Sequence, residues 1–200
     1  MSLAAALILA YLLGAIPMSL IVARVGAGVD LRAVGSRNLG ATNLYRALGW
    51  KYAVPAGLFD VAKGAAPTIF LPARVGTEPW LPLAIGAAAV TGHVFSVFVR
   101  FRGGKGVATA AGVVLALAPL PVLVSFVVWA GVVKLTGYVS LASILGAVVF
   151  PLAAWIIGVA NPWVVPVGTL LAAFIVFTHR TNLARLFAGT ENRFGRRRAA

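Results

Sequence analysis

The chain alternates long uncharged apolar stretches with short basic segments, and this alternation limits the folds available to it. Fifteen of the 17 lysines and arginines fall in four places: residues 24–51, residues 100–105, Lys134 and residues 180–198. A bilayer core hydrates neither backbone nor charge, so this pattern is typical of helical proteins that cross a membrane several times. The 61% share of hydrophobic residues agrees with that class. We therefore predict an all-α, polytopic integral membrane helical bundle, with residues 1–200 as a single domain.

The excess of positive charge, +13 in 200 residues, restricts the expected partners. The basic residues flank apolar stretches and do not form a solvated face, so membrane lipids and phosphorylated small molecules suit them better than nucleic acid. The terminal segment Arg196–Arg198 suits anionic headgroups. The chain has no cysteine, which excludes a thiolate nucleophile and a cysteine metal site.

Seven apolar segments are candidates for membrane helices, because about 20 residues cover a hydrocarbon core of roughly 30 Å. They are residues 3–23, 52–73, 80–99, 107–118, 121–133, 138–158 and 163–178. The first lacks the basic flank and cleavage site of a signal peptide and is predicted to be retained. The positive-inside bias places the amino terminus outside and the basic segments, with the carboxyl terminus, in the cytoplasm. Segment 107–118 would rise only about 18 Å, so five full spans plus a helical hairpin is the competing count.

The first basic segment contains Gly-Ser-Arg-Asn-Leu-Gly-Ala-Thr-Asn at residues 35–43, followed by Arg46. Glycine lets a backbone turn tightly and bring its N–H groups to an anion, while Ser, Thr and Asn add short donors and Arg adds a fixed positive fork. This composition predicts a phosphate site. The alternative is an ordinary interhelical turn with an Asn or Ser helix cap.

The second basic segment contains Gly-Gly-Lys-Gly at residues 103–106, just ahead of an apolar helix. Main-chain donors, a helix amino terminus and one mobile ammonium together predict a phosphate-binding turn. The spacing of a P-loop is absent. The alternative is a basic flank with flexible glycines, which explains Arg100 and Arg102 better than it explains Gly-Gly-Lys-Gly.

The last basic segment carries His179, Asn182 and Arg185. If the final helix continues through this segment, these residues recur every three positions and share one face. We interpret that face as a candidate site, whereas a single histidine at a membrane boundary can also be an interfacial polar residue.

Two charges, Asp60 and Lys63, lie inside the predicted span 52–73. Three residues apart on a helix, they can pair across one turn, which lowers the cost of placing either charge in the membrane. A structural clamp and a direct substrate contact are the two interpretations of this pair.

Three motifs, taken together, resemble those of the bacterial membrane glycerol-3-phosphate acyltransferases that use acyl phosphate as donor. They are Gly-Ser-Arg-Asn-Leu-Gly-Ala-Thr-Asn, then Gly-His-Val-Phe with Phe-Arg-Gly-Gly-Lys-Gly-Val-Ala-Thr, then His-Arg-Thr-Asn-Leu-Ala-Arg-Leu with Gly-Thr-Glu. The resemblance runs from Gly14 to Glu191 with the motifs in the family's order. Ser96 stands where the family usually has Pro, and Ala33 where a basic residue is common.

The resemblance implies an acyltransferase of phospholipid biosynthesis in the bacterial inner membrane, with its active site at the cytoplasmic face. It would transfer a fatty acyl group from acyl phosphate to the 1-hydroxyl of glycerol 3-phosphate, giving lysophosphatidate and phosphate. The catalytic residues implied by resemblance are Ser36, Arg46, Lys105, His179 and Asn182. The predicted substrate-binding residues are Arg37, Asn38, Gly40, Thr42, Asn43, Gly103, Gly104, Gly106 and Arg185. Asp60, Lys63 and Glu191 are predicted to be structural.

The chemistry of the implied donor fits the residues available. An acyl phosphate is already an activated mixed anhydride, so the reaction needs no cofactor, metal or protein nucleophile, only orientation and charge stabilisation. The general base is either His179 or an oxygen of the substrate phosphate, and Lys105 contacts either of the two phosphates. The alternative classes are a membrane transporter of small phosphorylated solutes, which would show inverted repeats and broken helices, and a lipid-binding structural membrane protein.

Overall fold

In the computed structural model, which describes residues 1–194, the chain forms helices joined by turns and loops, and those residues contain no strand. This confirms the predicted all-α class. The chain divides into two compact units, Met1–Ala116 and Leu117–Ala200. The single domain expected over residues 1–200 stays a prediction, and the basic segment Arg196–Arg198 lies outside the described residues.

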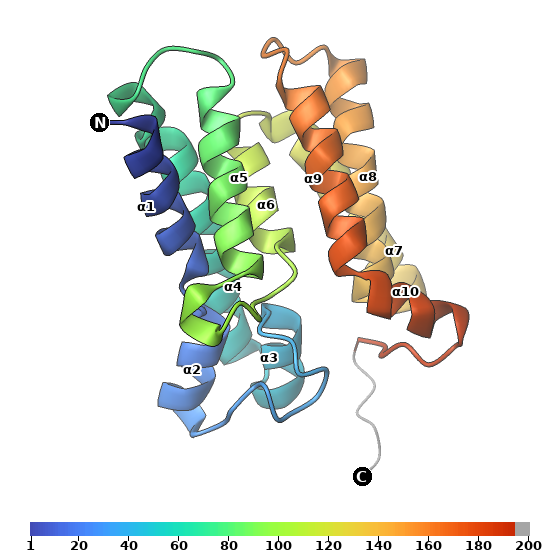
Figure 1. The fold of residues 1–200 in the computed structure, drawn as a ribbon. Coiled ribbons are helices and arrows are strands. Elements are labelled where there is room, and N and C mark those ends of the chain that lie inside the picture. Colours follow the sequence, from blue (N-terminus) through green and yellow to red (C-terminus); the bar gives the residue numbers. More distant parts are fainter. Residues whose placement is uncertain (195–200) are drawn as a thin grey trace. The chain divides into compact units, whose positions relative to one another are not determined.

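The amino-terminal unit packs its helices in close pairs, α1 against α5 and α4 against α6 (Figure 1). Its elements are α1 (Leu3–Ala15), α2 (Met18–Ala27), α3 (Ala41–Leu48), α4 (Trp50–Phe70), α5 (Leu81–Val94) and α6 (Val107–Leu115), with short 3-10 turns η1 (Pro72–Arg74) and η2 (Val97–Val99).

Glycines bring the paired helices of this unit into backbone contact. A Cβ at Gly14 of α1 would overlap the carbonyl of Ala89 in α5, and a Cβ at Gly112 of α6 would overlap the carbonyl of Val61 in α4. In a membrane, where burial of apolar surface between helices gains little, such close approach supplies the van der Waals packing that holds helices together.

The predicted membrane segment 3–23 lies within a candidate span, Leu3–Ala27, and its helix is interrupted between α1 and α2. Pro17 lacks a backbone N–H and disfavours helical geometry at the residue before it. Ile16 accordingly has ψ of 115°. The break is used by the fold: Ser96 Oγ donates to the Ala15 carbonyl at 2.5 Å, and Lys63 Nζ donates to the Ile16 carbonyl at 2.8 Å.

Over residues 117–194, the carboxyl-terminal unit contains three long helices and one short one, with α8 packed against both α7 and α9. They are α7 (Pro119–Thr136), α8 (Val139–Ile157), α9 (Val164–Thr178) and α10 (Arg180–Phe187). The final helix does not continue straight through the last basic segment, because α10 bends away from α9 by 58°. The bend falls at His179, whose backbone is in neither helix.

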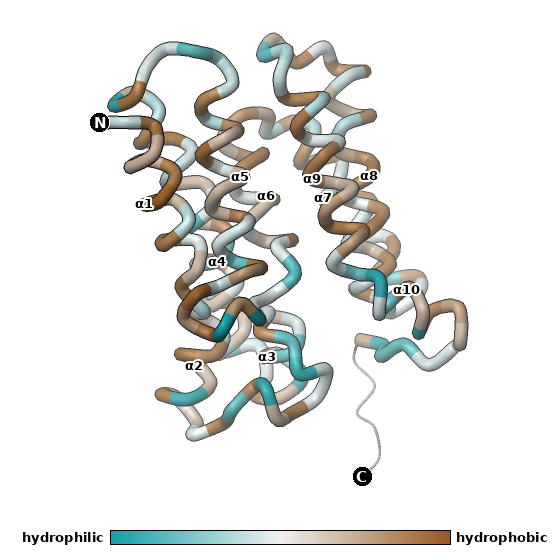
Figure 2. The backbone as a smooth tube through the Cα atoms, in the orientation of Figure 1, coloured by the Kyte–Doolittle hydropathy of each residue, from teal (hydrophilic) through white to brown (hydrophobic). Residues whose placement is uncertain are grey.

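Four helical segments of the described chain are long and apolar enough to cross a membrane, or five if α9 and α10 form one broken span. Segments 52–73 and 107–118 are not among them. The first corresponds to α4, which contains Asp60 and Lys63, and the second to α6, which has nine residues. Figure 2 shows hydrophobic colours along the helices and hydrophilic colours in the loop before α3 and around α10. An integral membrane class is therefore supported, and the count of seven stays a prediction.

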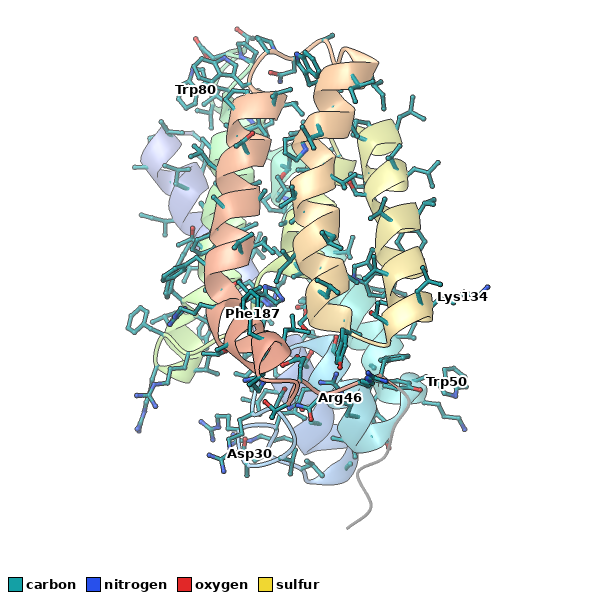
Figure 3. The ribbon with its side chains drawn as sticks, turned by 90° about the vertical axis from the view of Figure 1, so that its right-hand side faces the viewer. Asp30, Arg46, Trp50, Trp80, Lys134 and Phe187 are labelled. Atoms are coloured by element: carbon teal, nitrogen blue, oxygen red, sulfur yellow. The ribbon has the colours of Figure 1, made fainter. Side chains whose placement is uncertain are left out.

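The amino-terminal unit has two distinct ends, which the labelled side chains of Figure 3 mark. Trp80 lies at one end, whereas Asp30, Arg46 and Trp50 lie at the other. Tryptophan is enriched where a membrane meets water, so this placement suits a unit whose helices cross a bilayer. Arg46 of α3 thus lies at the same end of the unit as Asp30, in the loop between α2 and α3.

Candidate active site

The first polar loop, residues 28–40, is held in shape by one buried side chain, Asn43 of α3. Its Oδ1 accepts a hydrogen bond from the Ser36 backbone N–H at 2.9 Å, and its Nδ2 donates to the carbonyl of Val34 at 3.1 Å. The backbone is left-handed at Arg37, with φ of 58°. Ser36 and Arg37 are exposed as a result. Asn43 was predicted to bind substrate, and these contacts give it a place in the structure of the loop itself.

The acidic residue of this loop, Asp30, is neutralised by one arginine of the loop and one of α2. Asp30 Oδ2 receives the guanidinium groups of Arg32 and Arg24, each at 2.7 Å. Hydrogen bonds from Arg32 first, and then from Arg24, hold the pKa of the Asp30 carboxyl well below its usual range. The loop therefore presents no uncompensated negative charge at Asp30 to repel an anion.

The second polar loop, residues 100–106, contains Gly-Gly-Lys-Gly and contacts the last turn of α5. Gly103 N–H donates to the Val94 carbonyl at 2.9 Å, and Gly104 N–H donates to the His93 carbonyl at 3.1 Å. A Cβ at Gly103 would overlap the His93 carbonyl, so this close approach requires glycine. Lys105 follows as a half-buried side chain immediately before α6.

The two polar loops belong to one hydrophobic cluster, which places them together. Val99, the last residue of η2 and the residue just before the second loop, packs with Leu31 and Leu39 of the first loop and with Leu44 of α3. Motifs that are far apart in the sequence, one before α3 and one before α6, thus rest on the same core in the amino-terminal unit.

A buried group of ionisable side chains lies under the second loop. Lys63 Nζ is 2.7 Å from Asp60 Oδ1, so the predicted pairing of these charges is confirmed. His93 joins them, with Nδ1 3.7 Å from the same oxygen. No role was predicted for His93, whose only signal in the sequence was the Gly-His dipeptide within the second motif.

In the carboxyl-terminal unit, the Glu191 carboxylate accepts hydrogen bonds from polar residues of α10 and α8. Its Oε1 accepts from Asn182 Nδ2 at 2.6 Å and from Ser140 Oγ at 2.9 Å, and its Oε2 accepts from Arg185 Nε at 2.6 Å. Burial opposes ionisation of Glu191, but these three donors, Asn182 first, hold the pKa of its carboxyl below the usual value. Asn182 and Arg185 thus share a face, as the predicted helical spacing requires.

His179 is buried at the junction of α9 and α10, with 2% of its surface exposed. Its Nδ1 lies 2.8 Å from the Ile175 carbonyl. A carbonyl only accepts, so this contact assigns the proton to Nδ1 and the lone pair of the neutral ring to Nε2. That tautomer is the one needed for Nε2 to accept a proton.

The fold and these polar clusters define an integral membrane protein with two polar, glycine-containing loops, and comparison with known proteins specifies the class. The profile of the glycerol-3-phosphate acyltransferase family matches residues 4–189. A glycerol-3-phosphate acyltransferase of Thermus thermophilus is 47% identical over 194 residues, covering 96% of this chain and 94% of that protein. That of Aquifex aeolicus is 44% identical over 187 residues, covering 94% and 96%.

Two solved structures agree. The crystal structure of PlsY (YgiH), an integral membrane glycerol 3-phosphate acyltransferase, in its glycerol 3-phosphate form matches with a TM-score of 0.89 and 43% identity, covering 96% of each chain. Its lysophosphatidic acid form matches with a TM-score of 0.87 and 40% identity, covering 96% of this chain and 95% of that one. The chain belongs to the glycerol-3-phosphate acyltransferase family, and it is an acyltransferase.

Proposed function

We propose that this enzyme transfers a fatty acyl group from acyl phosphate to the 1-hydroxyl of glycerol 3-phosphate, giving lysophosphatidate and inorganic phosphate. The observation that carries the proposal is the Gly-Gly-Lys-Gly loop, seated by its backbone on α5 and presenting Lys105 ahead of α6. Carbonyls of α5 take the N–H groups of Gly103 and Gly104, so the Lys105 ammonium is the part of this loop that suits a phosphate group. The two PlsY forms, named for glycerol 3-phosphate and lysophosphatidic acid, agree with the acceptor and the product.

The reaction needs orientation and charge stabilisation more than covalent help from the protein. The 1-hydroxyl oxygen attacks the acyl carbonyl carbon, the bond from that carbon to the phosphate oxygen breaks, and phosphate leaves with the electron pair. Lys105, Arg46 and Ser36 are proposed to hold phosphate oxygens and to offset the charge that develops on them.

The hydroxyl proton needs an acceptor, and His179 is one of two candidates. Its Nδ1 contact with the Ile175 carbonyl leaves the lone pair on Nε2. The other candidate is an oxygen of the donor phosphate, which gains basicity as it leaves. Asn182, fixed by Glu191, is proposed to orient a polar group of the substrates.

The choice of acyl donor tests this proposal directly. Purified enzyme given glycerol 3-phosphate is expected to form lysophosphatidate with palmitoyl phosphate and not with palmitoyl-CoA, because the loops suit a compact phosphate and no nucleotide-binding motif is present in the sequence. Product is measured by mass spectrometry. Equal rates with the two donors would contradict the acyl phosphate assignment while leaving the acyltransferase class intact.

We also propose seven membrane crossings, with the amino terminus outside and the polar loops facing the cytoplasm of a bacterial inner membrane. The positive-inside bias supports this, since the loops of residues 24–51 and 100–105 carry eight lysines and arginines.

Single cysteines introduced into the cysteine-free chain check the orientation. Arg102→Cys and Ala160→Cys both replace exposed residues, in the second polar loop and in the turn after α8 respectively. On intact cells a membrane-impermeant maleimide is expected to label Ala160→Cys, and to label Arg102→Cys only after permeabilisation. The reverse pattern would overturn the orientation.

A further inference from the structure

The buried group of Asp60, Lys63 and His93 is not used by any step of the proposed reaction. The side chains of Asp60 and Lys63 are each 3% exposed, and that of His93 is 7% exposed. Burying ionisable groups is costly unless they are paired, and such groups in membrane-spanning helices are usually functional. The group of Asp60, Lys63 and His93 lies directly under the second polar loop, which points to a role in setting the conformation of that loop.

The contact between this group and the loop is made by one side chain. The three nearest atoms that a Cβ at Gly104 would meet are Nε2, Cε1 and Cδ2, all of the His93 ring. The backbone N–H of Gly104 also donates to the His93 carbonyl at 3.1 Å. His93 therefore supports Gly104 twice, through its backbone and through its imidazole, and the next residue is Lys105.

The far side of the same ring faces a fixed charge. Nδ1 of His93 is 3.7 Å from Asp60 Oδ1, a separation at which the contact is electrostatic and not a direct hydrogen bond. Asp60 is held by Lys63, and Lys63 donates to the Ile16 carbonyl at the break between α1 and α2. The ring is thus held between a charge anchored to α1 and the backbone of Gly104.

We propose that His93 is a positioning residue, whose imidazole, oriented by Asp60, sets the position of Gly104 and thereby aims the Lys105 ammonium at a substrate phosphate. This inference rests on the proposed function, which gives Lys105 its phosphate-binding role. It also gives the reason why position 104 requires glycine: the His93 ring occupies the space that a Cβ would fill.

A double-mutant cycle between the two positions tests this dependence. Gly104→Ala is expected to lower kcat/KM by about 10- to 100-fold, since its methyl group overlaps the ring and displaces the loop. His93→Ala is expected to raise the KM for one phosphate substrate more than it lowers kcat. The double variant is expected to be no less active than His93→Ala alone, because the atoms that the methyl group would meet are gone.

Two further variants keep the result interpretable. Thr91→Ala, on the exposed face of the same helix, is expected to retain wild-type kinetics. If His93→Ala does not fold, His93→Asn replaces it in the cycle: its amide keeps a polar partner near Asp60 but stops short of the position of Nε2. Thermal unfolding of each variant separates loss of folding from loss of positioning.

The coupling between positions 93 and 104 can also be measured without catalytic turnover. Binding of glycerol 3-phosphate and of inorganic phosphate is measured by calorimetry for the same set of variants. If the wild-type enzyme forms no lysophosphatidate, the proposed function fails, yet the same coupling is expected in phosphate binding. If the effects of the two substitutions multiply in both kinetics and binding, His93 does not position the loop and the inference is overturned.

Discussion

Replacing Lys105 with alanine is expected to lower kcat/KM by roughly 10- to 100-fold while the protein remains folded and inserted. The lysine follows two glycines whose backbone is fixed to the end of α5, so its ammonium has a defined reach toward a phosphate. Losing a charge-assisted hydrogen bond in a partly dehydrated site costs about 1.5–3 kcal/mol, which corresponds to that loss of rate. Steady-state kinetics with both substrates below saturation measures the effect.

The controls for Lys105 separate its position from its charge. Lys105→Arg is expected to recover part of the activity, because a planar guanidinium is bulkier than an ammonium in a turn walled by glycines. Lys134→Ala removes an exposed lysine from the last turn of α7 and is expected to leave turnover unchanged. Normal kinetics for Lys105→Ala would show that the second loop is only a basic flank of a membrane helix.

Gly112→Ala is expected to destabilise the protein by about 1–3 kcal/mol, although alanine is the better helix former. The added methyl group would overlap the Val61 carbonyl, a backbone atom that cannot move without separating α4 from α6. Scanning calorimetry in detergent is expected to show a melting temperature lowered by several degrees.

The matched control is Gly131→Ala in α7, where an added Cβ meets no atom within 4 Å. There the gain in helix propensity, about 1 kcal/mol, is expected to appear unopposed, so the melting temperature stays level or rises. Equal shifts for the two variants would show that the contact between α4 and α6 does not limit stability.

The sequence predicted the helical segments and the polar loops well, because hydropathy and the avoidance of charge in a bilayer leave few alternatives. It placed the last long helices at 138–158 and 163–178, and the structure has them at Val139–Ile157 and Val164–Thr178. The break within 3–23 had a visible signal in Pro17, which was not used. The bend at His179 had no such signal, since the residues around it are compatible with a continuous helix.

The contacts within the candidate site were less predictable, because they depend on packing between helices. The pair Asp60 and Lys63 follows from helical spacing alone, whereas the proximity of His93 requires α4 and α5 to be packed side by side. Asn43 illustrates a different limit. A side chain with both a donor and an acceptor suits a ligand and a loop equally well, and only the fold assigns its bonds to the loop.

The break at Pro17 has a consequence for how related sequences can diverge. Lys63 and Ser96 bind main-chain carbonyls there, so the identity of the residue at position 16 does not enter the contact. Apolar residues can replace one another at Ile16 while the hydrogen bond from Lys63 persists. Selection would therefore act on Pro17, which interrupts the helix, and on the donors Lys63 and Ser96. The side chain at position 16 can vary between related sequences while its carbonyl keeps the same place and the same hydrogen bond.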